Sequence, residues 1–312
     1  MAETPTARSG GSGSPETFDG LDGFDGLDGL DRFDGTLHRT GPVARARWAV
    51  RAWRMMAGMW MRSLMSYRTS FTLMAIANIA VTSLDFVVVV LMFRHTDTLG
   101  GWTLPELGFL YGTSALALGT ADLFVGSVDL LGDRIRTGTL DTMLVRPAPV
   151  LAQLCAERFS LRRLGRPVQA AAVLAWSIGE LPVHWTADRV LLVPVLLLCG
   201  SVIFASVFIG GATLQFWWGE AKELQNSFTY GGATLLQYPP TIFAKELVAG
   251  TVFGVPLAFV NWLPALHILG HPDPLGLPAA FQYASPLAAA LCVLAAALAW
   301  RAGLRAYQGT GS

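Results

Sequence analysis

Apolar residues occur in long stretches along most of the chain, separated by short segments rich in arginine, glycine and proline. About 20 apolar residues in an α-helix suffice to cross the hydrocarbon core of a bilayer. Stretches near or above this length predict six transmembrane helices, at residues 70–93, 104–130, 166–183, 190–217, 243–266 and 283–302. The predicted fold class is therefore an all-α integral membrane protein.

The segment ahead of the first predicted span, residues 43–68, is basic and amphipathic. Its arginines recur at helical spacing, and large apolar side chains fall largely opposite them: Arg47, Arg51, Arg54 and Arg62 against Trp48, Met55, Met59 and Trp60. This pattern is typical of an interfacial helix that lies in the cytoplasmic headgroup layer. A target helix for a calmodulin-like protein is disfavoured, because the first span follows at once.

The N-terminal residues differ in kind from the rest. Residues 16–35 repeat Asp-Gly pairs between Phe or Leu, and repulsion between the acids, together with glycine entropy, opposes compaction. We predict a disordered acidic cytoplasmic tail at 1–41, a six-helix transmembrane domain at 42–306 and a short cytoplasmic tail at 307–312. The alternative for the first region is an acidic docking peptide for a basic partner.

Composition and charge favour lipid as the surroundings of the chain. Of 312 residues, 53% are hydrophobic and only 14% are charged, against about a quarter charged in soluble domains. Residues 1–36 carry a net charge of −6, so the remainder of this neutral chain carries +6. We expect the lipid bilayer as a partner and no nucleic acid.

Basic residues between the spans predict the orientation, because cytoplasmic loops carry the excess of Lys and Arg. One side holds Arg39, Arg45, Arg47, Arg51, Arg54, Arg62, Arg68, Arg134, Arg136, Arg146, Arg158, Arg162, Arg163, Arg166, Lys222, Lys245, Arg301 and Arg305. The other side holds only Arg94 and Arg189. We expect both termini in the cytoplasm, a location in the plasma membrane, and no signal peptide in residues 1–40.

The second predicted span has one face of small and acidic residues. Its members are spaced by three or four positions: Gly112, Ala115, Gly119, Asp122, Gly126 and Asp129. Small residues let a neighbouring helix approach closely in lipid, so we expect this face and its carboxylates to pack against protein. A proton or substrate relay is the less favoured alternative, since it needs a continuous chain of ionisable groups across the membrane.

Asn78, Thr82 and Asp85 share one face of the first span. Charged side chains inside a bilayer are costly and are therefore functional candidates. Asp85 either contacts a cationic substrate or hydrogen-bonds across the helix bundle. Glu180 lies one turn from the outer end of the third span, where it can reach water, so it is weaker evidence.

The fifth predicted span contains Pro256 and Pro264 around Asn261. A proline inside a helix removes a backbone donor and kinks the helix, so we expect this span to bend or break before the outer face. The Pro-rich apolar residues after this span predict a short re-entrant element at the outer surface.

Chemistry for catalysis and for metal binding is not indicated. Neither lysine ends a Gly-x-x-x-x-Gly-Lys run, so the sequence holds no Walker A loop. His267 and His271 have Asp273 nearby, but Gly270 and Pro272 oppose the single helix that a metal site would need. No nucleophile elbow or Ser/His/Asp set is found, and the three distant cysteines predict no disulfide. We expect no enzyme activity, metal or bound cofactor in this chain.

The segment between the second and third spans carries the run GDRIRTGTLDTMLVRPAP. It resembles the loop Ile-Arg-x-Gly-x-Leu-Asp-x-x-Leu-x-Arg-Pro in the permease subunits of ABC-2 type exporters, in particular their small six-span group. The matching residues are Ile135, Arg136, Gly138, Leu140, Asp141, Leu144, Arg146 and Pro147, followed by Gln153. The fifth-span region also looks like that group, through Tyr238, Pro239, Pro256, Asn261 and Pro264.

The resemblance covers residues 45–305 and implies the type-2 ABC exporter fold. It implies that residues 132–147 form the coupling helix that docks on an ATPase subunit, through Arg136, Gly138, Leu140, Asp141, Leu144, Arg146 and Pro147. ATP and Mg²⁺ would then be bound by that cytoplasmic partner, and a second permease, identical or distinct, would complete a dimer. Gly138 would permit a tight turn before a short helix that Asp141 helps to cap and Pro147 ends.

The implied activity is export of an amphipathic or drug-like compound, as in multidrug efflux. The residues expected in the substrate path or in helix packing are Asn78, Asp85, Gly119, Asp122, Pro256 and Asn261. One alternative is a proton- or ion-coupled secondary carrier, which would need paired inverted halves. A second alternative is a membrane assembly factor without transport activity. In that case the basic loop would only set the topology of the chain.

Overall fold

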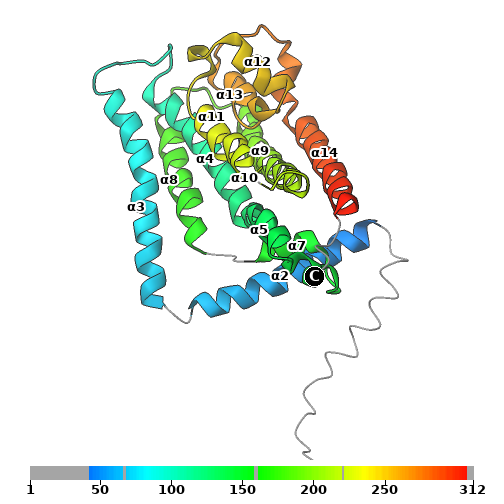
Figure 1. Cartoon of the computed structure of the whole chain (residues 1–312). Coiled ribbons are helices and arrows are strands. Elements are labelled where there is room, and N and C mark those ends of the chain that lie inside the picture. The colour runs from blue at the N-terminus through cyan, green and yellow to red at the C-terminus, as the bar shows by residue number, and fades with distance from the viewer. Residues whose placement is uncertain (1–41, 66–67, 158–160, 220, 308–312) are drawn as a thin grey trace, which may run out of the picture. The chain divides into compact units, whose positions relative to one another are not determined.

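The structure is a computed structural model that describes residues 42–65, 68–157, 161–219 and 221–307. It divides into two units, Met1–Arg47 and Trp48–Ser312. The first unit contributes only the start of one helix to the described residues, and the predicted acidic tail lies outside them. All longer regular elements in those ranges are helices (Figure 1).

The longer helices are α2 (Pro42–Met65), α3 (Arg68–Met92), α4 (Leu104–Val125), α8 (Gly165–Glu180), α9 (Ala187–Thr213) and α14 (Ser285–Ala306). The shorter helices are α5 (Leu131–Arg136), α6 (Thr139–Leu144), α7 (Val150–Ala156), α10 (Lys222–Asn226), α11 (Gly232–Leu236), α12 (Lys245–Phe253) and α13 (Trp262–Leu269). Single turns are η1 (Gly126–Leu130), η2 (Leu161–Leu164), η3 (Leu214–Phe216), the π turn η4 (Ser227–Gly231), η5 (Pro240–Ile242), η6 (Leu257–Phe259) and η7 (Ala279–Tyr283).

Five of the predicted spans correspond to helices of the structure: α3, α4 with η1, α8, α9 with η3, and α14. Three helical stretches are long and apolar enough to cross a membrane, namely Leu104–Arg136, Ala187–Phe216 and Ser285–Ala306. A shorter apolar helix covers Ile76–Met92. The described part of the chain is thus an all-α membrane protein, and the count of six spans stays a prediction.

The predicted fifth span, residues 243–266, is not a single helix. Helix α12 ends at Phe253 and α13 begins only at Trp262. Pro256 lies between them and has no amide hydrogen to continue the helical pattern. The predicted break is therefore present and complete, since α12 and α13 have nine and eight residues, too few to cross a bilayer.

A helical stretch that the hydropathy pattern did not indicate covers residues 222–236. Helices α10 and α11 join through η4 without a gap, and at 1.5 Å per residue the stretch is about 22 Å long. Its polar side chains include Gln225 and Thr229, which are buried. This stretch carries the chain from one end of the helix bundle to the other.

Lys245 lies at the opposite end of the bundle from Lys222. The amine of Lys222 is 3.9 Å from a carboxylate oxygen of Asp129, just beyond the end of α4. In contrast, the hydroxyl of Thr241, four residues before Lys245, donates a hydrogen bond of 3.0 Å to the carbonyl of Gly100 in the α3–α4 connection. The prediction that both lysines lie on one side is wrong, because the α10–α11 stretch crosses the bundle between them.

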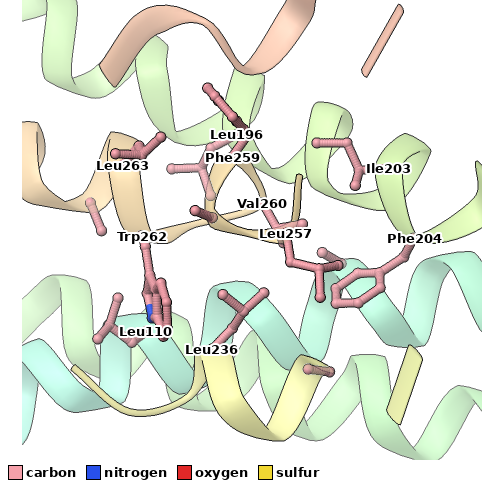
Figure 2. Packing of buried hydrophobic residues seen from close by; sticks show 14 of the residues in the cluster. Leu110, Leu196, Ile203, Phe204, Leu236, Leu257, Phe259, Val260, Trp262 and Leu263 are labelled. Carbon is pink, nitrogen blue, oxygen red and sulfur yellow. The ribbon is translucent and has the colours of Figure 1, made fainter. Parts of the chain in front are cut away.

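Helix α4 packs against α8 on one side and α9 on another, while α3 contacts α8 and α14 contacts α9. The largest cluster of buried apolar residues joins α4, α9, α11 and the η6–α13 region. Figure 2 shows Leu110, Phe204, Leu236, Val260 and Trp262 within it, all of them buried. Lipid tails are as apolar as these side chains, so the hydrophobic effect does not drive the helices together in a bilayer. The buried side chains stabilise the bundle through close van der Waals contact with one another.

Candidate functional site

The predicted coupling segment folds as two short helices, α5 and α6, joined by a tight turn at Gly138. This glycine has φ 69° and ψ 2°, a left-handed conformation that glycine adopts without steric cost. The amide of Gly138 donates to the carbonyl of Ile135 at 3.1 Å and thereby closes α5. The turn predicted at Gly138 is present, and it reverses the chain so that α6 can pack back on the bundle.

Helix α6 has a buried root and an exposed tip. Leu140 and Met143 are buried and belong to a cluster that we call the root cluster, whose other buried members are Val128, Leu131, Leu154, Cys155, Ala212 and Trp300. At the tip, Leu144 is 45% exposed and Val145 is 87% exposed. Arg146 and Pro147 are exposed beside them. The tip therefore offers apolar and basic side chains to the surroundings while the root is fixed to α9 and α14.

The predicted capping of α6 by Asp141 is not present in the structure, and its predicted contact with the ATPase stays a prediction. Its side chain makes no capping hydrogen bond at the start of α6, because its Oδ1 accepts a hydrogen bond of 2.9 Å from the hydroxyl of Tyr307. Burial and this contact with Asp141 raise the pKa of Tyr307. Asp141 thus ties α6 to the residue that follows α14, a partner 166 positions away that sequence spacing could not indicate.

Three further contacts that the sequence did not reveal hold the segment in place. The side-chain amide of Gln153 donates to the carbonyls of Met143 and Ala148, at 2.9 and 2.8 Å, so it secures the end of α6 and the proline-rich turn. Arg134 forms an ion pair with Glu157, which follows α7. Arg136, by contrast, is exposed and pairs with Asp133 on its own helix, so it is turned toward the solution.

Asp122 in α4 faces protein, and its charge is paired. Its Oδ1 accepts hydrogen bonds from the guanidinium of Arg163 and the hydroxyl of Tyr230, both at 3.1 Å. Arg163 also donates to the backbone carbonyl of Asp122 at 2.8 Å. Helical spacing could indicate neither partner, because they lie 41 and 108 positions further along the chain.

The small face of α4 packs closely against α8. A Cβ atom at Gly112 would lie 2.8 Å from Cβ of Leu174, and one at Gly119 would lie 2.8 Å from Cδ of Pro167. Both distances are shorter than van der Waals contact, so only glycine fits without a shift of the neighbouring helix. This geometry agrees with the packing interpretation of the spacing of three and four.

Asn261 is buried between three elements. Its side-chain amide donates to the carbonyls of Leu110 and Leu236, each at 3.0 Å, and so satisfies a carbonyl at the end of α11 that no helical amide reaches. Pro256 lies five residues earlier, at the edge of an apolar groove beside α14. The structure gives Asn261 a packing position between α4, α11 and the start of α13.

Asp85 lines a cleft of about 250 Å³ between α3, α4, the start of α8 and the η4–α11 stretch. The cleft is also lined by Tyr111, Arg166, Tyr230 and Tyr238. Asn78 lies two turns before Asp85, where its side chain packs beside Gly165 at the start of α8. Of the six residues expected in the substrate path or in helix packing, Asp85 is the one that lines this cleft.

The two histidines of the predicted re-entrant element have separate partners. His267 contacts Asp188 at 3.0 Å and the hydroxyl of Tyr283 at 2.8 Å. His271 contacts Glu106 at 2.9 Å and stacks on the ring of Trp102. In the part of the chain that the structure describes, no group of three His, Cys, Asp or Glu side chains converges as a metal site. These contacts instead hold residues 267–283 against the starts of α4 and α9.

Comparison with protein-family models matches residues 79–311 to the model described as ABC-2 family transporter protein. Comparison with curated proteins and with solved structures gave no match. The matched region includes the coupling segment, the cleft and every long helix from α4 onward, and the family implies association with an ABC ATPase and with the membrane. On this match, together with the bundle of apolar helices, the chain belongs to the ABC-2 transporter family.

Proposed function

We propose that this chain is the transmembrane permease subunit of an ABC exporter, and that it moves an amphipathic compound out of the cell. A separate ATPase subunit binds ATP and Mg²⁺ in the cytoplasm, since the chain itself holds no Walker A run. A second permease subunit, identical or distinct, completes the path across the plasma membrane.

The contrast between the root and the tip of α6 carries this proposal. Exposed side chains at Leu144 and Val145 are apolar, and Arg146 next to them is exposed and basic. A docking surface typically combines an apolar centre with charged residues that select the partner. The tip is therefore suited to a groove with an acidic rim on an ATPase subunit.

The root of α6 supplies a route from the ATPase to the membrane. Leu140 belongs to the same buried cluster as Ala212 near the end of α9 and Trp300 near the end of α14. Tyr307 adds a hydrogen bond to Asp141. A displacement of the tip is therefore transmitted to two of the long apolar helices, because closely packed side chains do not deform independently.

Co-purification of the ATPase subunit tests the docking role. Val145→Asp and Arg146→Gln alter only exposed side chains, so we expect insertion and folding to be unchanged. Each variant should lower the amount of ATPase recovered with the permease by at least fivefold. Arg301→Gln, which removes an exposed arginine of α14, serves as the control and should leave recovery unchanged.

Undiminished recovery of the ATPase with both tip variants would contradict docking at α6. Transport that persists when the ATPase is inactivated would favour the secondary carrier instead. A permease that retains the ATPase but moves no compound would favour the assembly factor.

A further inference from the structure

The cleft beside Asp85 is bounded by four segments that are far apart in sequence. Thr82 and Asp85 come from α3, Tyr111 comes from α4, and Arg166 lies near the start of α8. The fourth wall is formed by the η4–α11 stretch and the residues after it, including Tyr238. The cleft thus exists within one subunit and does not need a second copy to form its walls.

Several polar groups in the cleft are already satisfied within the subunit. The hydroxyl of Tyr111 lies 3.4 Å from both the carbonyl of Thr82 and the side-chain oxygen of Gln169. The hydroxyl of Tyr230 donates to Asp122 at 3.1 Å, and the guanidinium of Arg166 lies over the Tyr230 ring, 5.5 Å from its centroid. The two hydroxyls are thereby engaged, whereas Arg166 makes this ring contact and no hydrogen bond or ion pair within the described ranges.

Asp85 and Arg166 are the two charged residues that line the cleft. The carboxylate of Asp85 makes no hydrogen bond or ion pair with any residue that the structure describes. A carboxylate in an apolar membrane helix costs free energy unless something compensates its charge. At Asp122, Arg163 supplies that compensation. Asp85 has no ion pair in the described ranges, although Arg166 lines the same cleft.

Tyr238 complements this carboxylate. Its backbone carbonyl accepts a hydrogen bond of 2.9 Å from the indole of Trp262, which fixes the residue at the end of α11. Its side chain lines the cleft and has no hydrogen-bond partner in the described ranges. A tyrosine ring attracts an organic cation through its π face, so Tyr238 and Tyr111 offer aromatic surface near a negative charge.

We propose that this cleft binds a small amphipathic organic cation, whose charged nitrogen lies at Asp85 and whose apolar part contacts Tyr111 and Tyr238. An inorganic cation is a poor fit, because Ca²⁺ or Mg²⁺ requires six or more oxygen ligands and the cleft holds one carboxylate. An anion would have to lie against Arg166, whose guanidinium already faces the ring of Tyr230. The identification of this cation as the exported compound rests on the proposed function. The existence of the binding site does not rest on it.

Binding of benzyltrimethylammonium tests the proposal. The complete transporter is placed in phosphatidylcholine nanodiscs, and binding of the radiolabelled cation is measured with empty nanodiscs subtracted. Asp85→Asn should weaken binding at least tenfold, whereas Asp85→Glu keeps the charge and should stay within threefold of the original chain. Glu180→Gln removes an exposed carboxylate outside the cleft and is the matched control, so it should bind like the original chain.

Neopentylbenzene has the same shape as the probe but carbon in place of the charged nitrogen. It should not displace the cation, since the proposal assigns the recognition to charge. Equal binding by Asp85→Asn and the original chain, or displacement by neopentylbenzene, would overturn the cation site. Loss of binding in both Asp85→Asn and Asp85→Glu would also contradict it.

This test separates the site from the exporter function. If the ATPase is recovered through α6 but the cation binds independently of Asp85, the class of substrate is wrong and the exporter stands. If binding depends on Asp85 but no ATPase is recovered, the site stands and the exporter does not.

Discussion

Asp122 shows how a carboxylate is accommodated inside this bundle. The spacing of three and four along α4 predicted that it faces protein, and the structure places Arg163 and Tyr230 on its Oδ1. The identity of the arginine could not be predicted, because the same basic segment contains several arginines at comparable distances along the chain. Periodicity reports which face of a helix is buried, while the partner depends on how the next helix enters the bundle.

Gly119 offers a sharp test of the close packing at this face. Gly119→Ala places a Cβ atom 2.8 Å from Cδ of Pro167, so α8 must move or strain must be accepted. We expect a loss of about 1 to 3 kcal/mol in the free energy of unfolding, measured by denaturation in mixed micelles.

Gly179→Ala is the control for that substitution. It lies on α8 with no atom within 4 Å of the added Cβ, so its stability should be unchanged or slightly higher, since alanine favours helix more than glycine does. Equal stability of the two variants would contradict the close α4–α8 contact.

Among the elements, hydropathy failed in opposite ways at two neighbouring segments. Residues 222–236 are helical but were not predicted, because buried polar side chains such as Gln225 and Thr229 lower the hydropathy of the stretch. Residues 243–266 were predicted as a span because they are apolar, yet Val260 and Trp262 are buried among other residues of the chain. Hydropathy cannot distinguish an apolar side chain that faces lipid from one that packs against protein.

The end of α6 depends on one buried side chain. Gln153→Ala removes two hydrogen bonds, to the carbonyls of Met143 and Ala148, and should destabilise this segment by about 1 to 3 kcal/mol. We expect the amides of residues 139–148 to exchange with deuterium at least tenfold faster, measured by mass spectrometry, while exchange in α4 is unchanged.

Gln282→Ala, in η7 at the other end of the bundle, is the control and should leave exchange in residues 139–148 unaltered. If Gln153→Ala exchanges at the original rate, Gln153 does not secure the end of α6.

At the scale of the whole molecule, the structure places Lys222 and Lys245 at opposite ends of the helix bundle, whereas the sequence predicted one side for both. One end holds the α5–α7 segment and Lys222, and the other holds the α3–α4 connection and Lys245. Counting basic residues predicted the side of the arginine-rich loops, but it assigned Lys245 to the wrong end because the intervening helical stretch was not recognised. When one crossing of the bundle is missed, every residue between it and the next crossing is assigned to the wrong end.

Cysteine labelling in intact cells measures these sides directly. In a chain without Cys155, Cys199 and Cys292, Lys245→Cys should react with a membrane-impermeant maleimide added from outside. Lys222→Cys should react only after the membrane is opened, since it lies with the arginine-rich loops that favour the cytoplasm. Labelling of both positions from outside, or of neither, would contradict the placement of the two ends.

The close contact of α4 with α8 restricts how the bundle can move. Gly112 and Gly119 leave no space for sliding against Leu174 and Pro167, and the Arg163–Asp122 ion pair joins α4 to η2, the turn that leads into α8. These two helices therefore behave as one rigid body. The volume of the cleft beside Asp85 then changes only when α3 or the η4–α11 stretch is displaced, so release of a bound cation is controlled by the two walls that are not part of this pair.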